Sequence, residues 1–155
     1  MRHTALADQN CSIARTVAIL GERWTMVILR QAFLGARRFE DYHAGLGIAR
    51  NMLTDRLRGL VEHDILERRQ YHERPPRYEY RLTQKGLDLY PVLVSLMQWG
   101  DQHGGFEGAP MQLRHQNCGE LTAPVLTCSC CNEELDPKRV TPEPGPGAIA
   151  PAAAA

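Results

Sequence analysis

Four residues near the C-terminal end of the chain have the types and spacing of zinc ligands. His115 and Cys118 form an H-x2-C pair, and Cys128 and Cys131 form a C-x2-C pair after a gap of nine residues. Imidazole nitrogens and thiolates in two such pairs suit a closed tetrahedral zinc site. Because a closed site leaves no position for a substrate, the sequence predicts one structural zinc ion per chain and no enzyme.

The segment that carries these pairs is poor in large apolar side chains. Residues 112–137 cannot fold on hydrophobic burial alone, whereas zinc binding contributes roughly 10 kcal/mol or more to folding. We expect Gly119 to form a tight turn and residues 124–126 to form a strand between the pairs. Three alternatives stay open: Cys130 replaces Cys131 as a ligand, the thiols are redox-active, or the cysteines are incidental.

A fifth cysteine, Cys11, directly precedes the first expected helix, which starts with Ser12 as its N-cap. The positive end of a helix dipole stabilises a thiolate, so this position favours a reactive cysteine. The alternative is a small side chain that fills space where two subunits meet. The start of the chain lacks the apolar stretch of a signal peptide, so we expect a cytoplasmic protein. In that reducing compartment, five cysteines indicate metal binding or redox chemistry rather than structural disulfides.

A second kind of chemistry is indicated by polar residues on one face of a predicted helix over 49–63. Arg50, Thr54 and Arg58 recur every fourth residue with Asn51 beside them, while leucines form a buried stripe on another face. Arginine, asparagine and threonine near a helix N-terminus can reach phosphates and base edges in the major groove of DNA. The alternative is an ordinary solvated face.

A β-hairpin is predicted directly after this helix, with strands over 65–70 and 78–82. The loop YHERPPR between them contains two prolines, which we expect to keep the loop out of the ladder and to hold Arg74 and Arg77 at its tip. Such a hairpin can follow the DNA backbone or place an arginine in the minor groove. The alternative is a solvated surface turn.

The net charge of the chain is zero, but this zero is the sum of two unlike regions. Residues 1–105 contain 15 Lys+Arg and 12 Asp+Glu, a balance of +3, whereas residues 106–155 contain 3 and 6, a balance of −3. Sixteen of the 18 basic residues are arginine, which favours bidentate contacts to phosphate and guanine. Because +3 is modest, a nucleic-acid partner depends on where the arginines lie.

The remaining pattern predicts a mainly α chain with a small β-hairpin, an α+β winged helix-turn-helix. Gly45 and Gly47 supply the tight turn, Thr83 caps a short helix, and Gly86 is expected to be an exposed weak point in it. We expect a helix break before Pro91. The predicted helices cover 12–20, 22–33, 39–46 and 49–63, followed by the short helix after Thr83 and a last helix over 91–103.

The last predicted helix is more apolar than one small domain needs. Val92, Leu93, Leu96, Met97 and Trp99 all lie within it. We therefore expect a homodimer interface made by the N- and C-terminal helices, the alternative being a helix that closes the core of the monomer. The predicted organisation is a DNA-binding and dimerisation domain over 1–104, a Cys/His appendage over 105–140 and a disordered Pro/Gly/Ala-rich tail over 141–155, with no membrane segment.

Three sequence motifs resemble the HxlR family of bacterial, MarR-like transcriptional regulators. They are Cys11 ahead of a Gly-x-x-Trp, a Leu-x-x-Arg-Leu in the Arg-bearing helix, and Tyr-x-Leu-Thr-x-Lys-Gly after the hairpin, within a similarity that covers residues 11–103. The chain departs from many relatives at Ala49, where they carry Ser or Thr, so a side-chain cap is lost at that helix start.

The resemblance implies a homodimer of winged helices that binds a short inverted repeat, a pseudo-palindromic operator, in double-stranded DNA. By match of position, it assigns DNA contacts to the four helix residues and two hairpin arginines named above. It also makes Cys11 similar to cysteines that sense electrophiles or oxidants. The alternative function is a winged-helix interaction and dimerisation module whose zinc-stabilised tail is a docking surface.

Overall fold

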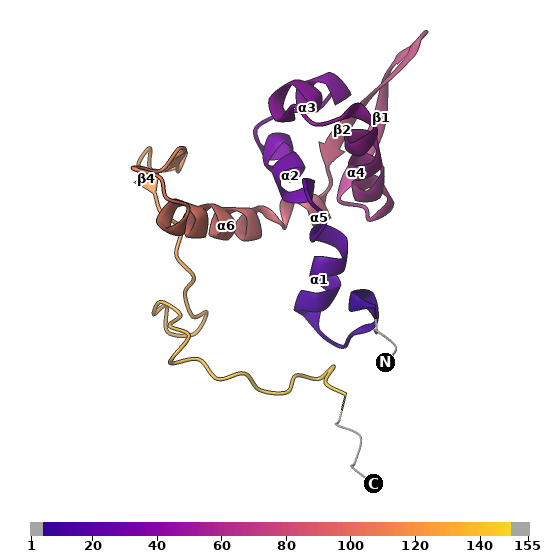
Figure 1. Ribbon diagram of the computed structural model, residues 1–155. Coiled ribbons are helices and arrows are strands. Elements are labelled where there is room, and N and C mark those ends of the chain that lie inside the picture. Colours follow the sequence, from indigo (N-terminus) through magenta and orange to yellow (C-terminus); the bar gives the residue numbers. More distant parts are fainter. Residues whose placement is uncertain (1–4, 150–155) are drawn as a thin grey trace. The chain divides into compact units, whose positions relative to one another are not determined.

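The computed structural model describes residues 5–149, and the chain divides into two compact units, one ending at Leu93 and the other beginning at Val94. The first unit contains helices and one antiparallel hairpin, which confirms the predicted α+β class (Figure 1). Among the described residues, no helix has both the length and the apolar character needed to cross a bilayer. The elements from the first unit onward are η1 (Leu6–Asp8), α1 (Ser12–Leu20), α2 (Thr25–Phe33), α3 (Phe39–Leu46), α4 (Arg50–Glu62), β1 (Leu66–Glu73), β2 (Pro76–Leu82), α5 (Gln84–Leu87) and α6 (Tyr90–His103).

The core of the first unit lies where α2, α3, α4 and the base of the hairpin meet. Helix α2 contacts α3 and β2, while α4 contacts α3 and β1. Leu53, Leu57 and Leu60 turn one side of α4 into this core, as the leucine spacing predicts, and so leave the opposite side of the helix to solvent. The buried cluster is completed by Leu20, Ile28, Leu29, Tyr42, Ile48, Ile65 and Leu66.

Helix α3 has a defined start and a defined end, and the turn from it to α4 is short. The carboxylate of Asp41 accepts hydrogen bonds from the backbone N–H groups of Arg38 at 2.8 Å and Arg37 at 3.2 Å, which caps the start of α3 and lowers the pKa of Asp41. Gly47 ends α3 with φ +63°, a conformation that favours glycine. The predicted bounds of α3 are therefore confirmed.

Helix α2 begins three residues later than predicted. Trp24 has φ +81°, in the left-handed region, so the chain becomes helical only at Thr25 rather than at Glu22. The Trp24 side chain still packs against the core, as its place in the apolar stripe indicates.

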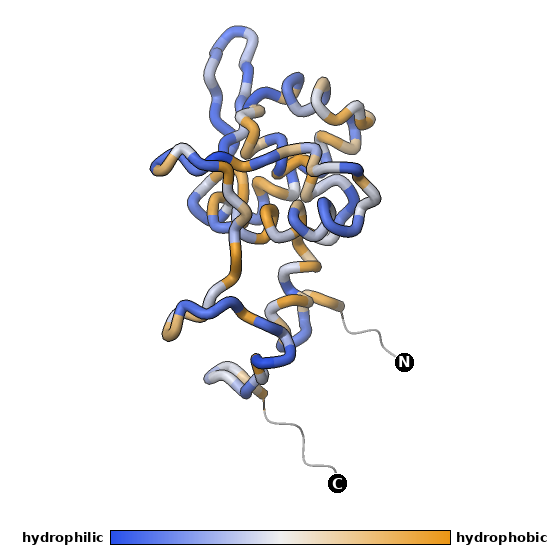
Figure 2. Tube along the Cα trace, turned by 90° about the vertical axis from the view of Figure 1, so that its left-hand side faces the viewer, coloured by the Kyte–Doolittle hydropathy of each residue, from blue (hydrophilic) through white to orange (hydrophobic). Residues whose placement is uncertain are grey.

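The hairpin is longer than predicted, and its prolines do not exclude pairing. Strands β1 and β2 pair up to Glu73 opposite Pro76, which leaves only Arg74 and Pro75 in the turn. A proline fits here because β1–β2 is a two-stranded sheet and the N–H that proline lacks is not needed by a further strand. Arg77 therefore lies in β2 opposite His72, and not in the loop. Figure 2 shows the hairpin as a largely hydrophilic projection from the helices.

Gly86 is buried, so its expected exposure is wrong. A Cβ atom at this position would lie much closer to the carbonyl oxygen of Ile65 than van der Waals contact allows, and 3.0 Å from the Leu82 side chain. The Thr83 hydroxyl caps α5 as predicted, accepting from the N–H of Gly86 at 3.1 Å. Glycine is thus required where α5 approaches the start of the hairpin.

The second unit contains little regular structure after α6. A short hairpin joins β3 (Leu113–Arg114) to β4 (Leu121–Thr122), and residues 124–126, expected to be a strand, are irregular and exposed. Between residues 104 and 149 no side chain is buried. Residues 124–126 therefore have no apolar core against which a strand could pack. Residues 141–149 contain no helix or strand, and the rest of the expected disordered tail, 150–155, lies outside the described residues.

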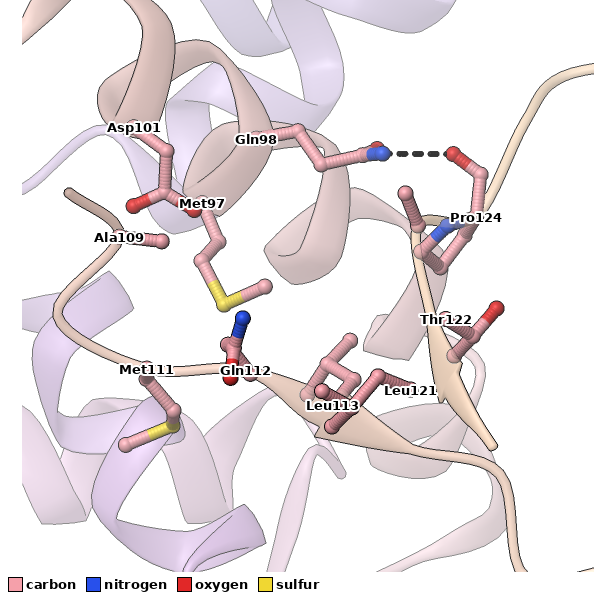
Figure 3. Close-up of a pocket in the computed structure, with 11 residues that line it drawn as sticks. Met97, Gln98, Asp101, Ala109, Met111, Gln112, Leu113, Leu121, Thr122 and Pro124 are labelled. Carbon is pink, nitrogen blue, oxygen red and sulfur yellow. Dashed lines mark hydrogen bonds between the residues drawn. The ribbon is translucent and has the colours of Figure 1, made fainter. Parts of the chain in front are cut away.

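The β3–β4 hairpin is attached to α6 within this second unit. Gln98 on α6 donates its side-chain N–H to the carbonyl oxygen of Pro124 at 2.6 Å (Figure 3). Around this hydrogen bond, an open pocket of about 300 Å³ is lined by side chains such as Met97, Asp101 and Leu121. The attachment therefore fixes one end of the segment that follows β4.

Candidate DNA interface

Four candidate DNA-contacting residues lie together on the exposed side of α4. Arg50, Asn51, Thr54 and Arg58 are all exposed, opposite the leucines that anchor the helix in the core. Helix α3 precedes α4 across the tight turn at Gly47, and the β1–β2 hairpin follows it. The sequence-predicted residues are thus brought together on one helix surface, next to a projecting hairpin (Figure 1).

Arg50 is held by two residues of α3 that the sequence did not single out. Its guanidinium forms an ion pair with Glu40, including a hydrogen bond of 3.1 Å, and lies 4.8 Å from the centre of the Phe39 ring. The hydrogen bond from Arg50 lowers the pKa of Glu40, and Glu40 raises the pKa of Arg50. Because both side chains are exposed, this ion pair is weak enough for a phosphate to replace the carboxylate.

The other three α4 residues have local partners. The Thr54 hydroxyl donates to the backbone oxygen of Arg50 at 2.8 Å, and the Asn51 side-chain oxygen accepts from the N–H of Met52 at 2.9 Å. Arg58 lies between two carboxylates, Asp55 at 3.0 Å and Glu62, one turn further along the helix, at 3.8 Å. Asn51 keeps its amide donors for a ligand, whereas the positive charge of Arg58 is largely balanced.

The hairpin presents cations that are not neutralised. Neither Arg74 nor Arg77 forms an ion pair within residues 5–149, and both are exposed. Two further arginines, which the sequence interpretation missed, lie over tyrosine rings of the hairpin. Arg38 lies 4.8 Å from the centre of the Tyr71 ring, and Arg68 lies 3.5 Å from the centre of the Tyr78 ring. The signal that could have found them is the pair of Arg-Arg sequences at 37–38, directly before α3, and at 68–69, within β1.

Cys11 is exposed and forms the N-cap of α1, one position before the predicted cap at Ser12. Its side chain makes no capping hydrogen bond, so the thiol is free of that constraint. Ile13 and Val17, on the helix that follows, are 75% and 44% exposed. The cysteine therefore lies beside apolar side chains that nothing within the described first unit covers.

Helix α6 also carries uncovered apolar side chains. Val92, Leu96 and Trp99 are 43%, 51% and 66% exposed, and Val94 is the buried residue of this helix. The alternative that this helix simply closes the core of a monomer does not explain these three exposed positions.

The candidate zinc ligands form two separate pairs. The Sγ atom of Cys118 lies 3.4 Å from Nδ1 of His115. In the other pair, Sγ of Cys128 accepts from the backbone N–H of Cys130 at 3.4 Å and lies close to Cys131. Hydrogen bonds from the backbone N–H groups of Cys131 and Cys130 lower the pKa of Cys128. Within residues 5–149, no three histidine, cysteine or acidic residues are gathered into one metal-binding group.

A helix-turn-helix followed by a two-stranded wing, with arginines on the second helix and on the wing, defines a winged helix-turn-helix DNA-binding protein. The family model described as HxlR-like helix-turn-helix matches residues 19–107. The chain belongs to the HxlR family of helix-turn-helix transcriptional regulators, which are not enzymes.

Relatives and solved structures agree with this family. The chain is 50% identical over 137 residues to the HTH-type transcriptional regulator Rv3095 of Mycobacterium tuberculosis, covering 88% of this chain and 87% of that relative. It is similar to the crystal structure of PA1607, with a TM-score of 0.80 and 31% identity over 90% of this chain and 99% of that one. The redox regulator HypR in its reduced form matches 61% of this chain and 95% of its own, with a TM-score of 0.58 and 29% identity.

Proposed function

We propose that this regulator binds an inverted-repeat operator in double-stranded DNA as a homodimer. In each half-site, α4 enters the major groove and the β1–β2 wing lies along the adjacent backbone or minor groove. The observation that carries the proposal is the exposed Arg-bearing side of α4, fixed by three buried leucines and flanked by a wing with unpaired arginines.

Exposed apolar side chains support the homodimer. Ile13 and Val17 on α1, and Leu96 and Trp99 on α6, are of the kind that a second copy of a soluble protein covers. A dimer also explains how a chain with no net charge, and a balance of only +3 over residues 1–105, binds DNA. Two copies with a handful of phosphate contacts each displace on the order of 8 counterions, which gives strong, salt-sensitive binding that one copy lacks.

The direct test is binding of the full chain to the DNA upstream of its own gene, measured by fluorescence anisotropy at several salt concentrations. We expect sequence-selective binding whose affinity falls steeply with salt. Arg50→Ala is expected to weaken binding by at least about fivefold. Lys138→Ala, which removes one cation from the tail, is the matched control and is expected to leave binding unchanged. Weak binding without sequence preference would instead favour the interaction-module alternative.

A second proposal is that Cys11 makes DNA binding responsive to electrophiles or oxidants. Its exposed position at the N-terminus of α1, beside the apolar side chains proposed to form the dimer contact, supports this, as does the similarity to the redox regulator HypR. An added quinone or disulfide-forming oxidant is expected to reduce DNA binding by the wild-type chain and to leave Cys11→Ser unaffected. Equal loss of binding in both proteins overturns the proposal.

A further inference from the structure

Two loops in the second unit have the same backbone construction. The His115 loop covers residues 115–119, and the Cys128 loop covers residues 128–132. In both, the N–H of the fifth residue donates to the carbonyl oxygen of the first, at 2.8 Å in the His115 loop and 2.9 Å in the Cys128 loop. The fifth residue has a left-handed conformation in each, Gly119 with φ +75° and Asn132 with φ +59°.

Each loop also closes a small antiparallel hairpin. The N–H of His115 donates to the oxygen of Glu120 at 2.9 Å, and the N–H of Cys128 donates to the oxygen of Glu133 at 2.8 Å. Strands β3 and β4 continue the first hairpin, and the bridge between Thr127 and residue 134 continues the second. The two hairpins therefore have the same turn geometry, which places the first and fourth residues of each loop alike.

In each loop this construction places metal-ligand side chains at the first and fourth positions. Nδ1 of His115 and Sγ of Cys118 lie 3.4 Å apart. Ligands at about 2.05 Å (nitrogen) and about 2.3 Å (sulfur), at the tetrahedral angle on one zinc ion, are about 3.6 Å apart. In the other loop, the N–H of Cys130 donates to Sγ of Cys128 at 3.4 Å, which suits a sulfur that carries thiolate charge.

The surrounding segment buries almost no apolar surface. Within residues 104–149 only Leu113 and Cys128 are even half-buried. Apolar burial therefore cannot hold two ordered loops in place, whereas metal binding to four soft ligands contributes folding free energy directly.

We propose that the His115 loop and the Cys128 loop close on one structural zinc ion, with His115, Cys118, Cys128 and Cys131 as its ligands. The two pairs lie on different hairpins, and metal binding brings them together by rotation within residues 123–126. A linker of four residues spans at most about 14 Å, so the pairs remain within reach of each other. Cys130 is not a ligand, because the matched positions in the two loops are the first and the fourth.

The ligand set predicts the consequences of single substitutions. The full chain, purified without chelator, is expected to contain about one zinc per chain by elemental analysis. Cys118→Ser and Cys128→Ser, one from each loop, are each expected to lose most of this zinc. Cys130→Ser is the matched control and keeps it. Zinc retained by Cys118→Ser, or lost from Cys130→Ser, overturns the assignment.

Cobalt substitution of the wild-type chain avoids any folding defect in the variants. Co²⁺ is expected to give the visible bands of a tetrahedral ion and thiolate charge-transfer absorption, both titrating to one equivalent. Zinc below about 0.1 per chain together with no such cobalt bands overturns the proposal. Neither readout involves DNA, so failure of the metal site and failure of operator binding are distinguishable.

Discussion

At the scale of single residues, Arg50 is positioned by α3 before any DNA arrives. Its guanidinium forms an ion pair with Glu40 and packs over the Phe39 ring, so the side chain is ordered at the start of α4. The carboxylate, however, occupies the hydrogen-bonding groups that a phosphate or guanine needs. Under the proposed function, operator binding exchanges the Glu40 carboxylate for a phosphate or guanine acceptor.

This exchange predicts the effect of Glu40→Gln. The substitution removes a competing negative charge close to the proposed phosphate position, and we expect the affinity for operator DNA to rise by about threefold at low salt. Glu133→Gln, in the tail, removes the same charge far along the chain and is the control. A fall in affinity measured by fluorescence anisotropy would show that Glu40 orients Arg50 rather than competing for it.

The sequence could not reveal this residue-scale arrangement. The face that carries Arg50 and Thr54 follows from helical periodicity, and the structure does expose it. The partner of Arg50 lies ten residues away on another helix, so its identity depends on how α3 and α4 cross the turn at Gly47. A tertiary approach of this kind leaves no local pattern in the chain.

At the scale of elements, hydrophobic periodicity and helix caps predicted most of the helices and strands. The wrong predictions concern residues whose environment depends on tertiary contacts or strand pairing. Helix α3 begins and ends as predicted, because Asp41 and Gly47 mark both ends locally. Gly86 resembled an exposed helix breaker, yet it is the contact point between α5 and the carbonyl of Ile65. Pro76 resembled a loop residue, although a two-stranded ladder accommodates it.

Gly86, which lies against a backbone carbonyl, and Gly59, which has open space beside it, give a paired prediction for stability. Gly86→Ala forces a methyl group against a backbone oxygen, and we expect the free energy of unfolding to fall by about 2–3 kcal/mol or more. Gly59→Ala on α4 meets no atom within 4 Å and is expected to raise it by up to about 1 kcal/mol. Urea denaturation of both variants checks the pair. A Gly86→Ala variant as stable as the wild-type chain would show that the approach of α5 to Ile65 is not rigid.

The wing gives a prediction about salt. Replacing Arg74 and Arg77 by alanine removes up to four phosphate contacts from a dimer, so the slope of log affinity against log salt is expected to become shallower by up to about 3.6. The hairpin itself should remain, because neither side chain is buried. An unchanged slope, with unchanged affinity, would place the wing away from the DNA.

At the scale of the whole molecule, the proposed operator binding requires two copies of the chain acting together. The net charge of one chain is zero, its winged-helix region over 1–105 carries a balance of only +3, and its Arg58 is largely neutralised by acidic neighbours. Inverted repeats are read by symmetric dimers, whose half-site spacing is set by the protein. The apolar side chains left exposed on α1 and on α6 are the residues available to make that dimer.

Trp99→Glu tests the proposed dimer contact. A charge at a buried interface position is costly, so we expect a monomer by analytical ultracentrifugation and at least about tenfold weaker operator binding. Leu34→Glu, at a side chain of similar exposure that follows α2, is expected to remain dimeric. If both variants form dimers of the same stability, α6 is not part of the dimer interface.

Operator binding by a symmetric dimer is tested by hydroxyl-radical footprinting of the full chain on the DNA upstream of its gene. Two copies of α4 in successive major grooves predict two protected regions on one face of the duplex, with centres about 10 base pairs apart. Protection should be lost with Arg50→Ala and retained with Lys138→Ala. A single protected region, or equal protection of a scrambled sequence, would contradict the account.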